Sequence, residues 1–149
     1  MPTLLSHAYR LSCALPAGAQ LFFAAVAAQV VFPRDVAALP RSDARRQLAA
    51  DLVGSMLARL DAATISLSAL AVLCAVLLSQ RKAAVLPLVA GLCAAASSGL
   101  ITPRIHAMRE AGETALPRFG LLHAVSSCLL LAKMIILVVA AVRAPESAR

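Results

Sequence analysis

The chain has few charged and few aromatic residues. Of its 149 residues, 14% are charged and 3% are aromatic, with one Tyr and no Trp. A soluble domain averages about 25% charged residues, so the low charge argues against a water-soluble globule. The net charge of +7 comes from scattered Lys and Arg, without a run of five or six like charges. Nucleic acid is therefore not an expected partner, because few rings are present to stack on bases.

The sequence also lacks the short motifs of common enzymes. It contains no G-x-S-x-G, no phosphate-binding glycine loop and no H-E-x-x-H. We therefore predict a non-enzymatic protein with no catalytic residue and no bound cofactor.

No C-x-x-C pair occurs either. The four cysteines fall one in each long apolar stretch, at Cys13, Cys74, Cys93 and Cys128. A disulfide scaffold needs paired cysteines, whereas an isolated cysteine in an apolar helix usually packs as a small hydrophobic side chain. Metal or thiol chemistry is the alternative for these four residues.

Four long apolar stretches make up most of the chain: 11–32, 62–80, 83–103 and 119–142. Each is long enough to cross a hydrocarbon core, which takes about 20 helical residues. Helices are expected because unpaired backbone groups cannot be left in lipid. The prediction is an all-α integral membrane protein, a single domain over 1–149 folded as a four-transmembrane-helix bundle, with the lipid bilayer as its partner. The first stretch is expected to remain uncleaved, because apolar sequence continues past Ala17-Gly18-Ala19.

The connection between the first two spans is predicted to hold an amphipathic helix over about 43–60. Ser42 is the expected N-cap, and Leu48, Leu52, Met56 and Leu60 recur every four residues. This helix either lies at the membrane interface or runs continuously into the second span. A surface for a partner protein is the alternative role.

Four spans place both termini on one side of the membrane. The tight Arg81-Lys82 turn on that side would resist translocation, which favours cytoplasmic termini in a bacterial inner membrane. Counting all Lys and Arg favours the opposite orientation, since the other side carries more of them.

Small and polar residues recur along two spans at helical spacing. The two stripes are Gly18, Phe22, Ala25 and Gln29, and Gly91, Ala95, Ser98 and Thr102. Such stripes allow helix backbones to approach closely. They are expected to pack the bundle, and in a purely structural subunit or a homo-oligomer they would join it to other chains.

The fourth span carries polar residues within about 120° of its circumference, when successive residues are spaced by about 100°. They are His123, Ser126, Ser127 and Lys133, together with Phe119. The Lys133 side chain leans toward the helix N-terminus and so toward mid-membrane, where an ammonium group needs a partner or a wet cavity. The alternative is that Lys133 only reaches a backbone carbonyl or a lipid headgroup.

The predicted topology gathers further polar residues at the end of the bundle opposite the termini. They are Gln29, Asp61, Thr64, Thr102, His106 and His123. An Asp–His or Asp–Arg pair there would hold a ligand or shuttle a proton in a polar vestibule. A transition metal on the two histidines and Asp61, and a hydrogen-bonded layer that only fixes the bundle, are the alternatives.

Two motifs resemble those of a known family. Thr102-Pro103-Arg104 closes the third span, and Phe119-x-x-x-His123-x-x-Ser126-Ser127 lies in the fourth. In these residues and in its layout the chain resembles the transmembrane protein 205-like membrane domain, a family of unknown function. The resemblance implies a four-helix membrane protein without established enzymatic activity that handles a small molecule or a soft metal. Leu130 departs from the family pattern, which has a polar Asn near that place, and Lys133 lies outside the pattern.

The leading functional prediction is a membrane protein that binds or passes a small solute or soft metal through a polar vestibule. Its candidate ligand-binding residues are His123, Ser126, Ser127, Thr102, Arg104, Asp61, Gln29 and Lys133. A haem- or copper-binding redox protein, using His123 with His106 or Lys133, is the alternative, and a structural membrane subunit is the third possibility.

Overall fold

The computed structural model describes residues 2–145, without the side chain of Pro2. Four helical rods in this part of the chain are long and apolar enough to cross a membrane: Thr3–Val31, Ala44–Leu77, Arg81–Glu110 and Pro117–Val142. The predicted all-α architecture with four spans is confirmed.

Two of the four rods contain a short π-helical turn. The first consists of α1 (Pro2–Phe22), η1 (Phe23–Ala27) and α2 (Ala28–Val31), and the third consists of α5 (Arg81–Ala96), η2 (Ser97–Ile101) and α6 (Thr102–Glu110). The second and fourth are the uninterrupted helices α4 (Ala44–Leu77) and α7 (Pro117–Val142). Two short helices, α3 (Arg34–Ala38) and η3 (Glu113–Ala115), lie in the connections.

Local sequence explains where the spans begin and end. The N-cap of α4 is Asp43, whose side chain accepts a hydrogen bond from the backbone N–H of Arg45 at 2.8 Å. The expected cap at Ser42 was therefore one residue early. Pro117 opens α7 at a position where its missing N–H costs little. Gly112 follows α6 with a φ of 70°, a left-handed conformation that glycine adopts without strain.

The segment 43–60 runs continuously into the second span, which is one of its two expected arrangements; the other was a helix lying at the membrane interface. The segment is the first half of α4, which runs for 34 residues, or about 51 Å, without a break. Leu48 and Leu52 of the predicted apolar stripe are exposed, whereas Met56 and Leu60 are half-buried. The stripe therefore meets the rest of the bundle only in its second half.

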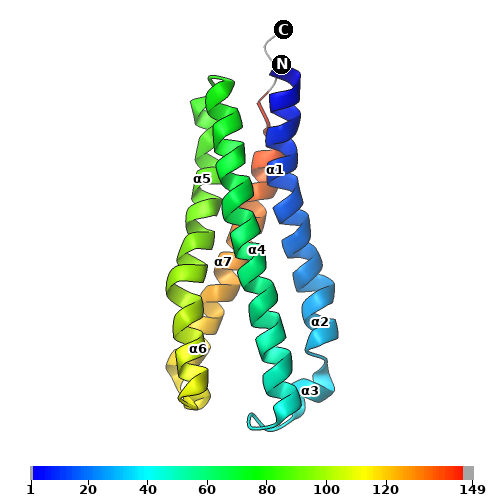
Figure 1. Cartoon of the computed structure of the whole chain (residues 1–149), viewed down its shortest axis with the longest axis vertical. Coiled ribbons are helices and arrows are strands. Elements are labelled where there is room, and N and C mark those ends of the chain that lie inside the picture. Colours follow the sequence, from blue (N-terminus) through cyan, green and yellow to red (C-terminus); the bar gives the residue numbers. More distant parts are fainter. Residues whose placement is uncertain (1, 146–149) are drawn as a thin grey trace.

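The four rods form a ring in which successive spans run in opposite directions (Figure 1). The first rod packs on α4 and α7, and the third rod also packs on α4 and α7. It follows that α4 and α7 face each other diagonally across the bundle. The Ser6 hydroxyl donates a hydrogen bond to the carbonyl of Pro145 at 2.6 Å, so the two ends of the described chain lie together at one end of the ring.

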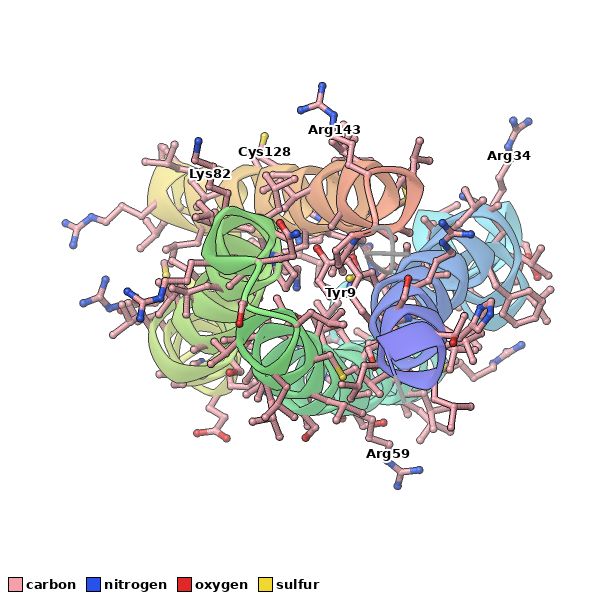
Figure 2. The ribbon with its side chains drawn as sticks, turned by 90° about the horizontal axis from the view of Figure 1, so that it is seen from above. Tyr9, Arg34, Arg59, Lys82, Cys128 and Arg143 are labelled. Carbon is pink, nitrogen blue, oxygen red and sulfur yellow. The ribbon has the colours of Figure 1, made fainter. Side chains whose placement is uncertain are left out.

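Small side chains fill the half of the bundle nearest the termini. The core cluster consists of Tyr9, Cys13, Ala17, Ala71, Cys74, Ala75, Ala90, Leu137, Ala140 and Ala144. Figure 2 shows Tyr9 pointing into the middle of the ring, where its hydroxyl donates to the carbonyl of Ala83 at 2.8 Å. Cys13 and Cys74 pack here as small hydrophobic side chains, as predicted, while Cys128 is exposed on the outside.

The other half of the bundle is packed more loosely. No residue of α2 or α6 is buried, and in α7 the first buried residue is Ser126. In α4, Ala49 is the one buried residue before Asp61. Burial is thus more extensive in the half nearest the termini, and in the other half it includes Phe23 and Ala27 of η1 and Ser97 of η2.

Candidate functional site

A layer of polar side chains lies where the two halves of the bundle meet. We call Gln20, Asp61, Thr64, Ser68 and Lys133 the polar layer; each is at most 1% exposed. By helix rise, Asp61 is about 24 Å from the C-terminal end of α4 and Lys133 about 14 Å from that of α7. The layer is therefore deep inside the spans and far from both ends.

An ion pair crosses the centre of the layer. The Lys133 ammonium donates a hydrogen bond to Oδ1 of Asp61, and both side chains are 1% exposed. The pair joins α7 to α4 diagonally, and the lysine reaches it because its side chain leans toward the helix N-terminus. The expected partner for Lys133 is thus present.

The expected pairing of Asp61 with a histidine or arginine was wrong. Arg59 points away from the bundle (Figure 2), because two residues along an α-helix turn the side chain by about 200°. The partner comes from α7 across the ring, which only the tertiary arrangement decides.

A second contact in the layer joins the first span to α4. The amide nitrogen of Gln20 donates to the hydroxyl of Thr64 at 2.9 Å, and that hydroxyl donates to the carbonyl of Leu60 at 2.7 Å. Because the hydroxyl proton is used in the second bond, Thr64 must accept from Gln20, which fixes the orientation of the amide. The carbonyl oxygen Oε1 of Gln20, on the other branch of the amide, is buried.

Three buried oxygens of the layer have no hydrogen-bond partner among the described residues: Oε1 of Gln20, Oδ2 of Asp61 and Oγ of Ser68. Buried polar groups are nearly always hydrogen-bonded, because an unmet one costs about 1–3 kcal/mol. Two of the three accept only, while Lys133 has three N–H donors and uses one on Asp61. The layer therefore combines unmet hydrogen-bond acceptors with an ammonium group that has further N–H donors.

Backbone irregularities border the layer on two helices. The π-helical turn η1 begins three residues after Gln20, and η2 begins at Ser97, which is itself buried. Single π turns inside α-helices are frequent at functional sites, and each changes the phase of the side chains that follow. On α5, a Cβ at Gly91 would lie 3.2 Å from Cβ of Ser68, so the glycine allows α5 to approach the layer closely.

Several predicted site residues lie outside the layer. His123, Ser127, Gln29 and Arg104 are exposed, and Thr102 is half-buried. The ring of His123 stacks on Phe119 with centroids 6.5 Å apart. Within the predicted arc of α7, Ser126 and Lys133 face the interior, whereas His123 and Ser127 lie at its other edge and face outward.

Of the two predicted small-residue stripes, that of the first span is exposed, whereas that of the third is mostly half-buried and includes Gly91, which packs on Ser68. Gly18, Phe22, Ala25 and Gln29 are all exposed. The buried stripe of the first span is instead Cys13, Ala17 and Gln20, and that of the third is Pro87, Ala90, Ala94 and Ser97. Gln20 and Ser68 were missed at the sequence level, although Asp61, Thr64 and Ser68 recur at helical spacing on one face of α4 and could have been found there.

The two candidate metal-ligating histidines have different neighbours. The His106 ring lies against α4 at Gly54, where a Cβ would be 3.5 Å from its Nε2, and His123 stacks on Phe119. One turn after His106, Arg109 forms an exposed ion pair with Asp51 at 2.8 Å. Among the residues that the structure describes, no group of three or more His, Cys, Asp or Glu is placed to hold a metal ion.

No family model, curated protein or solved structure matches the chain. Its function is therefore inferred from the geometry of the polar layer.

Proposed function

We propose that the protein is a non-enzymatic membrane protein that passes a small polar solute through its bundle by way of the polar layer. The observation that carries the proposal is the set of unpartnered oxygens beside the buried Asp61–Lys133 pair. Ionisable groups inside a membrane are costly, and they commonly mark solute or proton pathways. A purely structural pair would be expected to have both carboxylate oxygens satisfied.

The loosely packed half of the bundle suggests the route to the layer. The absence of buried residues from α6 and from the first turns of α7 favours entry from the end opposite the termini. Tyr9 and the small-residue core close the other end, so passage requires these side chains to move apart. We assign the termini to the cytoplasm of a bacterial inner membrane.

The polar atoms of the layer that could contact a solute indicate which kind of solute it accepts. They are oxygens and an ammonium nitrogen, whereas soft metals prefer thiolate, thioether or imidazole ligands. A small hydrogen-bonding solute or a proton is therefore favoured over a soft metal. Membership of the transmembrane protein 205-like family also remains a proposal, with Thr102-Pro103-Arg104 at the start of α6 and His123 on the outside of α7.

The test is flux into proteoliposomes. Vesicles with the purified protein are mixed with urea or glycerol and followed by stopped-flow light scattering, and proton entry is followed with trapped pyranine. We expect at least one probe to enter several times faster than into protein-free vesicles. Rates equal to those of protein-free vesicles for every probe would contradict the proposal.

Two variants tie the flux to the layer. Gln20→Met removes an unpartnered oxygen without changing charge, and we expect it to reduce the flux several-fold. The charge-swapped D61K/K133D keeps an ion pair and tests whether its polarity matters. The control is Asp51→Asn, which alters an exposed carboxylate of the same helix and should leave the flux unchanged.

A further inference from the structure

A groove on the outside of the bundle lies between α6 and α7, at the end opposite the termini. Its volume is about 420 Å³, and it is lined by Arg104, Ala107, Met108, Arg118, Leu121 and Leu122. Four of these side chains are apolar and two are guanidinium groups. The wall of the groove is thus apolar, and two arginines border it.

Both arginines lie at the boundary of the apolar sequence. Arg104 directly follows the apolar stretch 83–103, and Arg118 directly precedes the stretch 119–142. This position places them at the level of the lipid headgroups, with Leu121 and Leu122 turned toward the acyl chains.

Neither guanidinium is neutralised by the protein. Both side chains are exposed, and no carboxylate of residues 2–145 lies within 4 Å of either. The neighbouring Arg109, in contrast, pairs with Asp51. Two unpaired guanidinium groups over an apolar floor complement an anion that carries a hydrocarbon chain.

We propose that this groove binds one anionic phospholipid. Arg104 and Arg118 hold the phosphate, because a guanidinium offers paired N–H donors that match phosphate oxygens. An acyl chain lies along Met108, Leu121 and Leu122. A basic pocket between two transmembrane helices can hold the headgroup of an anionic lipid. The apolar floor favours a lipid over free phosphate, which would gain nothing from it.

A second groove on the bundle provides an internal comparison. It lies between η1 and α4 and is lined by Ala19, Phe22, Phe23, Ala27, Met56, Arg59 and Leu60. It contains one arginine instead of two, so a phosphate there would be held by a single guanidinium. We expect this groove to accept lipids without a strong preference for anionic headgroups.

Native mass spectrometry of the purified protein tests the proposal. The protein is titrated in detergent with phosphatidylglycerol and, separately, with phosphatidylcholine of the same acyl chains. We expect one phosphatidylglycerol to bind with high occupancy and phosphatidylcholine to bind at least about tenfold more weakly, since the choline cation offsets the phosphate charge and is repelled by the two guanidinium groups. Equal binding of the two lipids would overturn the proposal.

Matched variants locate the site. R104Q/R118Q should weaken phosphatidylglycerol binding by about tenfold or more, because neutral amide donors replace guanidinium donors, whose charge-assisted bonds are roughly twice as strong. R34Q/R41Q removes the same charge from exposed arginines at the same end of the bundle and should have little effect. Equal losses in the two variants would show a diffuse surface charge and overturn the proposal.

Two further measurements distinguish a bound lipid from bound inorganic phosphate. Leu121→Gln should weaken phosphatidylglycerol binding, while inorganic phosphate should not compete for the groove. Competition by millimolar phosphate would overturn the assignment to a lipid. The lipid site does not depend on solute passage, because its residues lie outside the polar layer.

Discussion

At the scale of single residues, the Asp61–Lys133 pair dominates the energetics of the interior. Two charges taken out of water lose hydration worth several kcal/mol each, and their attraction offsets this loss only while both are present. Each residue is 1% exposed, so solvent cannot replace a missing partner. Replacing one of the two charged side chains is therefore expected to lower the free energy of unfolding more than replacing both.

Asp61→Asn should destabilise the protein by about 3–5 kcal/mol, because Lys133 would remain buried without a counter-charge. The double variant D61L/K133L should recover most of this loss, since an apolar pair of similar volume is often neutral or stabilising. The measurement is the thermal unfolding midpoint in detergent, followed by circular dichroism.

The matched control is Asp51→Asn, which breaks the exposed ion pair with Arg109. Exposed pairs contribute about 0–1 kcal/mol, so the midpoint should hardly move. If D61N and D61L/K133L lost equal stability, the two charges would not be coupled and the account of the pair would fail.

At the scale of elements, the glycines of the two predicted small-residue stripes differ in what they contact. Gly91 of α5 faces Ser68 of α4, and a Cβ at this position would lie 3.2 Å from Cβ of Ser68. Gly18 of α1 has nothing within 4 Å of the corresponding point. Only Gly91 therefore sets the distance between two helices within one chain.

Gly91→Leu should lower stability by about 1–3 kcal/mol, the usual cost of forcing extra methylenes into packed space. Gly18→Leu, the control in the first span, should have little effect on the same unfolding midpoint. A large loss in Gly18→Leu would mean that this glycine packs against another copy of the chain, and a neutral Gly91→Leu would contradict the close contact between α4 and α5.

At the scale of the whole molecule, the ring fixes which loops share a side. The turn after α4 lies at the end with the termini, and the connection between α6 and α7 lies at the opposite end (Figure 1). Closed packing toward the termini and loose packing toward the other end make the two sides unequal. Orientation in the membrane therefore decides from which side the polar layer is reached.

Single cysteines placed at Gln80 and Ala115 report this orientation with a membrane-impermeant maleimide. With the termini in the cytoplasm, Ala115→Cys should be labelled on intact cells and Gln80→Cys only after the membrane is opened. The four native cysteines lie within spans, so the wild-type protein is the control for background labelling. The reverse pattern would invert the orientation, and labelling of both positions on intact cells would contradict the four-span topology.

Composition and spacing along the chain were enough to predict four helical spans and to single out Lys133 as an ammonium group at an unfavourable depth. These follow from local physics: an apolar run of about 20 residues suffices to cross the bilayer, and a buried ammonium group cannot be left alone. The side chain's lean toward mid-membrane also followed from the direction of the Cα–Cβ bond.

The face that each helix turns inward, and the residues that meet there, depend on how the four spans pack together. Helical periodicity groups residues into stripes but does not say which stripe faces the axis, so Gln29 and His123 were placed with a site that Gln20 and Ser68 occupy. The π turns then shift the phase within two spans, which a regular projection misses. The pairing of Asp61 with Lys133 depends on α4 and α7 lying diagonally across the ring, and contacts so distant in sequence are set by the packing of all four spans together.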